Sequence, residues 1–251
     1  MVDRPALQLD AVGLQIGGAR ILHDVTLQVA TGEMVGVIGP NGAGKTTLFN
    51  IISGVMIPTS GTVRLAGNDV TGHKVHQRAR VGLGRTFQTS SVFAGLTAGE
   101  NVRLAAQSKL GGATSPWRFP RLGDEAAQVA DRCLGEVGLA HHTDTGAGVL
   151  SHGDKRKLEI AMLLATEPEV VLLDEPMAGV GSGDVAGLVE VIRRLHASGR
   201  TVLMVEHHME VLLGLVDRVA VMHHGELLAI DTPKAVMANT EVQKAYLGET
   251  V

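Results

Sequence analysis

Gly39-Pro-Asn-Gly-Ala-Gly-Lys-Thr46 is a complete G-x-x-x-x-G-K-S/T phosphate loop. The apolar run Met34–Ile38 before the loop is typical of a buried strand, and the stretch Thr47–Ser53 after it is typical of a helix. Glycines allow a turn between such elements to point its backbone N–H groups at phosphate, and the helix N-terminus completes the anion site. This stretch therefore predicts that the chain binds a nucleoside triphosphate.

Two side chains of the loop have distinct expected roles. Lys45 is expected to reach the β- and γ-phosphates, and the Thr46 hydroxyl is expected to take one position around Mg²⁺. The residues that we expect to bind ATP through the loop are Gly39, Pro40, Asn41, Gly42, Ala43, Gly44, Lys45, Thr46 and Thr47. A glycine-rich turn without chemistry would not require both a strand and a helix beside it, so the pattern favours the phosphate loop.

Composition limits the partners of the chain. Of its 251 residues, 45% are hydrophobic but only 2% are aromatic, so nucleic-acid bases would find few side chains on which to stack. The formal net charge of −4 gives no general attraction to nucleic acid or to an anionic membrane surface. The single cysteine, Cys133, excludes an intrachain disulfide and fits a reducing compartment as a buried helix residue. We therefore expect no nucleic-acid partner.

The apolar runs of the chain are short. Val170–Leu173 has the length of a strand and falls far below the ~20 residues that cross a bilayer. We expect the chain to be soluble by itself, so any work at a membrane would need a partner that supplies the spanning helices.

Short strand patterns surround the phosphate loop. Leu7–Val12 and Val25–Val29 alternate apolar and polar residues, and Gly61–Leu65 and Arg80–Phe87 are further strand candidates. We expect these segments to form a small antiparallel β-layer beside a parallel core.

The second half of the chain alternates helices and strands. Helical periodicity from Thr97 to about Leu164 predicts an inserted α-helical lobe. Strands at Val170–Leu173 and Thr201–Val205, joined by a helix at Asp184–Ala197, make the βαβ pattern of a parallel sheet. A hairpin about Gly225 and two terminal helices are expected to close the chain.

These patterns together predict an α/β fold, in which a parallel-sheet core carries an antiparallel β-layer and an inserted α-helical lobe. We expect a single domain over residues 1–251, with the core and β-layer at 1–96 and 165–251 and the helical lobe at 97–164. Within the lobe, residues 108–123 are expected to form an exposed loop.

Two carboxylates, Asp174 and Glu175, follow the apolar run Val170–Leu173. A strand buried on both faces would deliver Asp174 to the carboxyl edge of the sheet, where ligands bind in open α/β folds. Asp174 is thus expected to hold Mg²⁺, directly or through water, opposite Thr46, and Glu175 is expected to polarise the attacking water. An acidic strand end that merely meets solvent is the alternative, and a phosphate loop in the same sheet argues against it.

A predicted helix start at Ser151 offers a second anion site. Ser151 with Asp154 three residues later resembles a capping box, which stabilises a helix N-terminus. The Ser151 hydroxyl and the Gly153 backbone N–H are also suited to bind phosphate at such a terminus. The local pattern is compatible with both interpretations.

The order of these motifs resembles a known family. The phosphate loop, Gln88, Leu150-Ser-His-Gly-Asp154, Val170–Glu175 and His207 follow one another as in the nucleotide-binding subunit of ABC transporters. The resemblance covers essentially the whole chain and implies a P-loop NTPase of ABC type, which hydrolyses ATP and uses Mg²⁺. It also implies a head-to-tail dimer, because the family's LSGGQ-like signature contacts the γ-phosphate of nucleotide held by the opposing subunit.

The signature of this chain departs from LSGGQ at His152 and Asp154. Ser151 and Gly153, the residues that the resemblance implies touch phosphate, remain.

The resemblance assigns roles to two further side chains. It implies that Gln88 senses Mg²⁺ and links the site to the membrane partner. It implies that His207 is the switch histidine, which hydrogen-bonds the γ-phosphate and the catalytic water.

Two other positions depart from the family. Ile16 occupies the place where the family usually has an aromatic side chain that stacks on adenine, so an aliphatic face is expected to cover the base. The loop Pro176–Gly181 lacks the aspartate found in many members, which implies that communication between the two sites differs.

Importers of branched-chain amino acids and related small amides are the branch that this chain resembles most. The marks of that branch are Gly84–Gln88, Leu158–Ile160, Asp174–Gly179, Glu206–Met209 and Glu241–Glu249. The pairing of Leu-Ser-His-Gly with Leu-Glu-Ile is also familiar from urea-type members, so an importer of urea or short-chain amides stays an alternative.

The resemblance also implies the partners. They are a second ATPase subunit, identical or homologous, integral membrane permease subunits and, indirectly, an extracytoplasmic solute-binding protein. It implies a peripheral location at the cytoplasmic face of the cell membrane.

Three other classes of protein fit less well. ABC-type ATPases of DNA repair or ribosomes typically carry coiled-coil or zinc insertions, or two tandem cassettes. A subunit that binds ATP without hydrolysis would not need an intact Glu175 and His207. A P-loop kinase or GTPase would leave Ser151–Asp154 unexplained, and no Asn-Lys-x-Asp guanine motif follows the loop.

Overall fold

The phosphate loop joins a strand to a helix, as the sequence predicts. The computed structural model describes residues 4–86, 92–110 and 125–247. Strand β3 (Met34–Ile38) is buried at every position, and helix α1 (Lys45–Ser53) begins two residues earlier than the sequence predicts. Gln88 lies outside the described residues.

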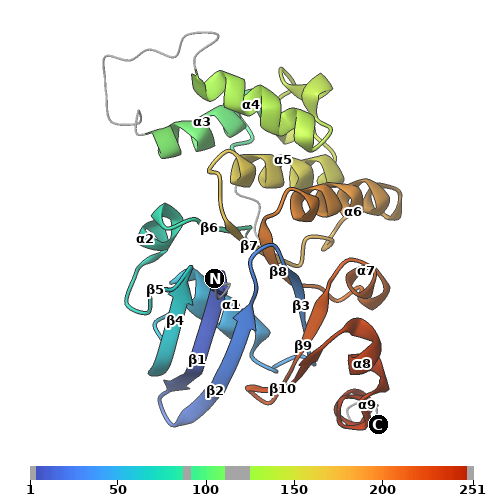
Figure 1. The fold of residues 1–251 in the computed structure, drawn as a ribbon. Coiled ribbons are helices and arrows are strands. Elements are labelled where there is room, and N and C mark those ends of the chain that lie inside the picture. Colours follow the sequence, from blue (N-terminus) through green and yellow to red (C-terminus); the bar gives the residue numbers. More distant parts are fainter. Residues whose placement is uncertain (1–3, 87–91, 111–124, 248–251) are drawn as a thin grey trace. The chain divides into compact units, whose positions relative to one another are not determined.

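The chain divides into two compact units (Figure 1). The first unit consists of Met1–Arg85, Glu169–Glu175 and His196–Val251, and the second of Thr86–Pro168 and Pro176–Leu195. Residues 176–195 thus group with the helical segment rather than with the sheets. The single-domain organisation over residues 1–251 stays a prediction.

A six-stranded sheet organises the first unit, in the order β10-β9-β3-β8-β7-β6. Neighbouring strands are parallel except for the closing hairpin of β9 and β10, which the sequence predicts correctly. Besides β3, the strands are β6 (Leu83–Arg85), β7 (Val170–Asp174), β8 (Thr201–Val205), β9 (Arg218–His223) and β10 (Glu226–Asp231).

The predicted antiparallel β-layer is also present in the first unit. Its strand order is β2-β1-β4-β5, and every neighbouring pair is antiparallel. Its strands are β1 (Leu7–Ile16), β2 (Ala19–Val29), β4 (Ser60–Leu65) and β5 (Asn68–Asp69).

The assignment of Arg80–Phe87 to this β-layer was wrong. Helix α2 (Val75–Arg80) ends there, and the strand that follows, β6, pairs in parallel with β7 in the six-stranded sheet. The hydrogen-bonding partner of a strand lies far away in sequence, so a short strand pattern does not reveal which sheet it joins.

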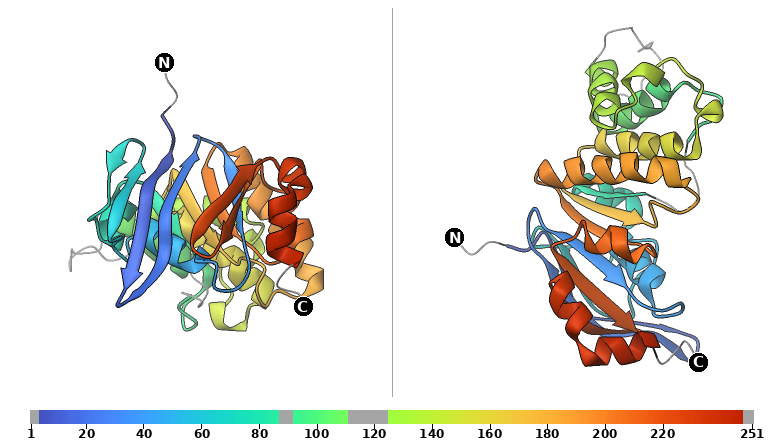
Figure 2. Two further views of the ribbon diagram at one scale, coloured as in Figure 1. Left: turned by 90° about the horizontal axis from the view of Figure 1, so that it is seen from below. Right: turned by 90° about the vertical axis from the view of Figure 1, so that its right-hand side faces the viewer.

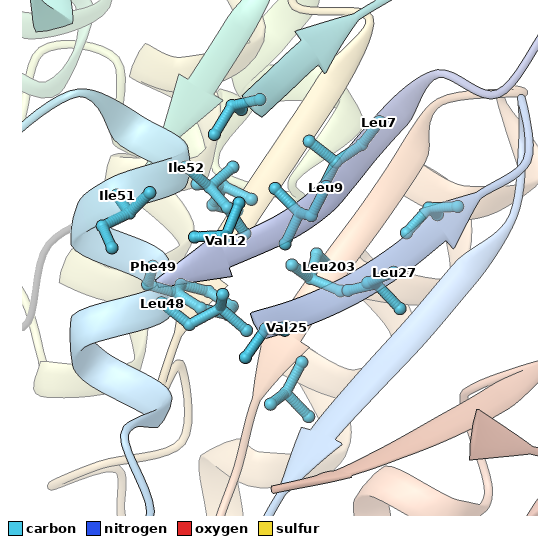
Figure 3. Packing of buried hydrophobic residues seen from close by; sticks show 14 of the residues in the cluster. Leu7, Leu9, Val12, Val25, Leu27, Leu48, Phe49, Ile51, Ile52 and Leu203 are labelled. Atoms are coloured by element: carbon cyan, nitrogen blue, oxygen red, sulfur yellow. The ribbon is translucent and has the colours of Figure 1, made fainter. Parts of the chain in front are cut away.

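The core of the first unit is built from residues of both sheets and of α1 (Figure 3). Alternate residues of the strands face this core because side chains of a strand point to opposite faces in turn. Figure 3 labels members of this cluster from β1 (Leu7, Leu9 and Val12), from β8 (Leu203) and from α1 (Leu48, Phe49, Ile51 and Ile52). On the other face of the sheet, Leu212 of α7 (Met209–Leu213) packs against Gly36. The C-terminal helices α8 (Pro233–Ala238) and α9 (Thr240–Leu247) cover β9 and β10 (Figure 2).

The second unit is helical, as the periodicity predicts. It contains α3 (Ala98–Leu110), α4 (Glu125–Glu136), α5 (His152–Leu164) and most of α6 (Ser182–Ala197). Cys133 is buried on α4. Residues 108–110 of the expected loop at 108–123 belong to α3 instead, and residues 111–123 lie outside the described residues. Among the described residues, no helix has the length and apolar character needed to cross a membrane.

Candidate functional site

The register of the parallel sheet brings three strand ends to one edge. Val205 at the end of β8 pairs with Asp174 of β7 on one side and with Val37 of β3 on the other. Because parallel strands share a direction, the residues that follow these positions emerge together. The phosphate loop, Glu175 and Glu206 therefore meet at the carboxyl edge of the sheet.

Lys45 folds back over its own loop at the start of α1. Its Nζ donates hydrogen bonds to the backbone oxygens of Gly39, at 2.6 Å, and Pro40, at 2.9 Å. The side chain is buried, and burial lowers the pKa of Lys45, while the charge of Glu175 partly offsets this effect. Thr46 in the first helical turn is exposed, so its hydroxyl is accessible to a ligand.

Other residues of the loop are packed to different degrees. Ala43 is buried, Asn41 and Gly42 are exposed, and Thr47 is half-buried. Hence the loop presents backbone to solvent at its tip while it is anchored at both ends.

Two glycines allow the loop to fit between neighbouring strands. A Cβ atom on Gly39 would lie 2.2 Å from the backbone oxygen of Met222 in β9, which leaves no room for a side chain. Gly44 has a φ of 97°, and a Cβ there would lie 2.7 Å from Leu22 Cδ2 of β2. Both sheets therefore fix the path of the loop.

Glu175 and His207 meet at this edge. His207 Nε2 lies 3.0 Å from Glu175 Oε1, within hydrogen-bond distance. Glu175 has a positive φ of 49°, and its N–H donates to the Val205 backbone oxygen at 2.9 Å. A carboxylate hydrogen-bonded to an imidazole beside a phosphate loop is suited to orient a water molecule and to move its proton.

Glu206 orders the turn that carries His207, a role that the sequence analysis missed. Its buried carboxylate accepts hydrogen bonds from the N–H of His207 at 2.8 Å and of His208 at 3.1 Å. A carboxylate directly after an apolar strand and before a histidine was the available signal.

Asp174 is paired with an arginine that the sequence analysis also missed. Arg85 Nη2 lies 2.7 Å from Asp174 Oδ2, and both side chains are buried. No local pattern marks Arg85, because β6 becomes a neighbour of β7 only in the folded sheet.

The donor set at this edge suits Mg²⁺. The Thr46 hydroxyl and the Asp174 carboxylate are hard oxygen ligands, and Mg²⁺ characteristically keeps several waters and phosphate oxygens besides one or two protein ligands. The described residues include no cluster of three or more His, Cys, Asp or Glu side chains that could hold a metal without such help.

Ser151 and Gly153 belong to the second unit. Ser151 is the N-cap of α5, and its Oγ accepts a hydrogen bond from the Asp154 N–H at 3.0 Å. A Cβ on Gly153 would lie 2.5 Å from Cβ of Asp184 in α6, so only glycine fits there. The capping interpretation of this motif is confirmed, and the anion site stays a prediction.

Asp154, which replaces the last residue of LSGGQ, is held by charged and polar neighbours. Burial raises the pKa of Asp154, but hydrogen bonds from Lys157 and Ser151 outweigh burial and bring the pKa below its usual value. The Lys157 Nζ lies 3.1 Å from Asp154 Oδ1.

Ile16 is 54% exposed at the end of β1. The hairpin that follows leads into β2, whose Leu22 is the residue that confines Gly44. An exposed aliphatic side chain on this hairpin is compatible with the predicted cover for the base.

Comparison with known proteins identifies the family to which this chain belongs. A family model described as ABC transporter matches residues 22–178. The chain is 38% identical over 255 residues to BraF, a high-affinity branched-chain amino acid transport ATP-binding protein of Pseudomonas aeruginosa. It is 37% identical over 254 residues to LivG, a protein of the same description from Escherichia coli K12. Each alignment covers 99% of this chain and 100% of the relative.

Solved structures of ATP-binding cassettes have the same fold. The ADP conformation of MJ1267, an ATP-binding cassette of an ABC transporter, superposes with a TM-score of 0.86 at 29% identity and covers 97% of this chain and 99% of its own. A dimeric post-hydrolysis state of the cassette MJ0796, bound to ADP and Pi, has a TM-score of 0.75 at 26% identity, with coverage of 90% and 98%. The chain belongs to the ABC transporter family, as one of its ATP-binding cassette ATPases.

Proposed function

We propose that this ATPase hydrolyses MgATP in a head-to-tail dimer and thereby powers the import of branched-chain amino acids through a separate membrane permease. The hydrogen bond between Glu175 and His207 beside the phosphate loop carries the proposal of hydrolysis. BraF and LivG, which align over their whole length, support the choice of solute.

The residues of the phosphate loop would bind and orient the nucleotide. Lys45, now held on the loop carbonyls, would contact the β- and γ-phosphates, and the backbone N–H groups would surround them. Thr46 and Asp174 would hold Mg²⁺, which neutralises charge on the phosphates when it is bound. Gln88 would complete this set and link it to the permease.

Glu175 would orient the attacking water and accept its proton. His207 would hydrogen-bond the γ-phosphate and keep Glu175 in place through the 3.0 Å contact. Ile16 would cover the adenine. Phosphoryl transfer needs positioning and charge stabilisation rather than a covalent intermediate, so these groups would act by holding the water and the phosphates in place.

The proposed dimer supplies the rest of each site. Ser151 and Gly153 of the opposing subunit would contact the γ-phosphate, so ATP would close the dimer and hydrolysis would reopen it. The dimeric cassette with ADP and Pi supports this arrangement as a form that related cassettes adopt. In this scheme residues 1–251 act as a single ABC ATPase domain, with 97–164 as the helical signature lobe.

The proposed partners place the chain at the cytoplasmic face of the cell membrane. Integral membrane permease subunits would receive the motion, and an extracytoplasmic solute-binding protein would deliver the solute. The solute would never touch this subunit, so its identity depends on those partners.

Transport by the assembled system tests the proposal. The chain would be reconstituted in liposomes with the permease and binding protein encoded by neighbouring reading frames, and uptake of labelled leucine, urea and acetamide would be measured with internal MgATP. We expect leucine uptake, which Glu175→Gln abolishes without loss of assembly. Uptake of urea or acetamide in place of leucine would favour the amide-importer alternative, and ATP-independent leucine uptake would contradict the proposal.

A further inference from the structure

Arg85 occupies an unusual position for a charged side chain. It is the last residue of β6 and is paired in register with Leu172 of β7, a buried apolar residue. Only 8% of its side chain is exposed. A buried guanidinium requires a counter-charge and hydrogen-bond acceptors, because its removal from water is costly.

Three elements meet at this guanidinium. Nη2 contacts Asp174 Oδ2 of β7 at 2.7 Å, and Nη1 donates to Asn50 Oδ1 at 2.8 Å and to Ser53 Oγ at 2.7 Å. Asn50 and Ser53 lie on α1, the helix that begins at the phosphate loop. The guanidinium carbon also lies 6.0 Å from the ring centroid of Phe49 on the same helix.

In the metal-free site, Arg85 already provides a positive charge beside the Asp174 carboxylate. Asp174 is 2% exposed, so solvent contributes little to the balance of its charge. Arg85 and Mg²⁺ are both positive, and each would interact with the same carboxylate. Like charges at such short range repel strongly in a protein interior.

We infer that Arg85 is a positioning residue that balances Asp174 in the metal-free site and that Mg²⁺ must share Asp174 with it. The inference rests on the proposed role of Asp174 in metal binding. Asp174 would be held less tightly by Arg85 when it also binds Mg²⁺, and the same guanidinium holds Asn50 and Ser53 of α1. The contacts of Arg85 would therefore link the metal position to α1, the helix of the phosphate loop, and to β6.

A magnesium titration of nucleotide binding tests this inference without reliance on turnover. Binding of a fluorescent ATP analogue to the full chain would be followed from EDTA to saturating Mg²⁺. We expect Arg85→Met to lower the half-saturating Mg²⁺ concentration about three- to tenfold, because the competing charge is gone. Arg85→Lys, which keeps the charge, should stay near the parent value.

A matched control is available in the other sheet. Arg64 pairs with Asp10 at 2.5 Å, also between two strands, but the pair is more than one third exposed. Arg64→Met should leave the Mg²⁺ titration unchanged. An unchanged or raised half-saturating concentration in Arg85→Met would overturn the inference.

Denaturant unfolding in EDTA gives a second measurement. Loss of one partner of a buried ion pair is strongly destabilising, whereas replacement of both partners is far less so. Arg85→Met/Asp174→Asn should therefore unfold at a higher denaturant concentration than Arg85→Met, even where the single variant does not fold at all. A double variant no more stable than the single one would show that Arg85 acts only by packing and would overturn the inference.

The same titration distinguishes a failure of the proposed function from a failure of this inference. If the parent chain shows no Mg²⁺-dependent binding, or if Asp174→Asn leaves that dependence unchanged, the metal role of Asp174 is wrong. If the parent chain binds nucleotide in a Mg²⁺-dependent way and Asp174→Asn removes that dependence, but Arg85→Met leaves the half-saturating Mg²⁺ concentration unchanged, then only the inference about Arg85 is wrong.

Discussion

Among single residues, Glu175 adopts a backbone conformation that side chains with a Cβ atom usually avoid. Its φ is 49°, directly after β7, and its N–H is held by the Val205 backbone oxygen. The left-handed conformation costs roughly 1–2 kcal/mol for such a residue. Strain of this kind concentrates at functional sites, and here it accompanies the contact between the carboxylate and His207.

The strain at Glu175 can be measured by two truncations. Both Glu175→Gly and Glu175→Ala remove the carboxylate, but only glycine accepts a positive φ without a steric penalty. We expect the free energy of unfolding of Glu175→Gly to exceed that of Glu175→Ala by about 1 kcal/mol. Urea unfolding of the two variants is the measurement.

Glu190 provides the control for this comparison, because it is half exposed on α6. In a helix alanine is preferred to glycine by about 1 kcal/mol, so Glu190→Ala should be the more stable variant there. If the alanine variant were the more stable one at position 175 as well as at position 190, the assignment of strain to Glu175 would be wrong.

Among the elements, α1 is anchored at both ends. Its N-terminus forms the phosphate loop, and its C-terminal carbonyls are capped by Arg78 of α2. Arg78 Nη1 donates to the backbone oxygens of Ile51, at 2.6 Å, and Ile52, at 2.7 Å, while Nη2 and Nε donate to those of Thr71 and His73, each at 3.0 Å. Burial lowers the pKa of Arg78 to about 10, although the charge of Asp69 partly offsets this effect.

Arg78→Met should lower the free energy of unfolding by about 2–4 kcal/mol, because it leaves several buried carbonyl groups without a donor. Arg80→Met, at an exposed position on the same helix, should change it by less than about 0.5 kcal/mol. Denaturant unfolding compares the two variants. An Arg78→Met variant as stable as Arg80→Met would show that the cap does not contribute to stability.

The N-terminus of α5 should be sensitive to acid through Asp154. The pKa of this carboxyl is lowered in the folded chain, so the ionised form stabilises the fold above the unfolded pKa and this contribution is lost as pH falls through the folded pKa. Asp154→Asn should therefore cost about 1 kcal/mol near pH 7 and progressively less below pH ~4. Urea unfolding across this pH range measures the difference.

Asp131 on α4 gives the matched control, because its side chain is exposed. Asp131→Asn should show no comparable dependence on pH. A constant effect of Asp154→Asn at every pH would contradict the role of its charge.

At the scale of the whole molecule, the proposed mechanism requires two copies of the chain, because each site combines the phosphate loop of one subunit with Ser151 and Gly153 of the other. Glu175→Gln should retain ATP binding but lose at least about 100-fold in turnover, since the general base is gone. The unhydrolysed ATP should then hold a closed dimer, which size-exclusion chromatography with MgATP would detect. Near-normal turnover in Glu175→Gln would overturn the assignment of Glu175.

Lys45→Ala tests nucleotide binding in the same assay, whereas Glu175→Gln tests hydrolysis. Loss of the loop ammonium should abolish nucleotide binding, so this variant should not dimerise with MgATP. Unchanged ATP affinity would contradict the assigned role of Lys45.

Local sequence was sufficient for much of this protein. The phosphate loop, the buried strands on either side of the site and the helical periodicity between Thr97 and Leu164 are set by neighbours along the chain, so patterns of spacing and turn residues predict them. The same holds for the N-cap at Ser151, which depends on a residue three positions away.

Pairings between distant segments could not be predicted in this way. Arg85 and Asp174 are 89 positions apart, and Glu175 and His207 are 32 apart, so their contacts depend on which strands become neighbours and in what register. Local patterns therefore do not reveal that the strand within Arg80–Phe87 pairs with β7, or that Arg85 is the partner of Asp174. Motifs of the chain determined that it is an ATP-binding cassette, whereas the parallel register of the sheet determined which charged side chains lie beside the phosphate loop, because only folding brings those strand ends to one edge.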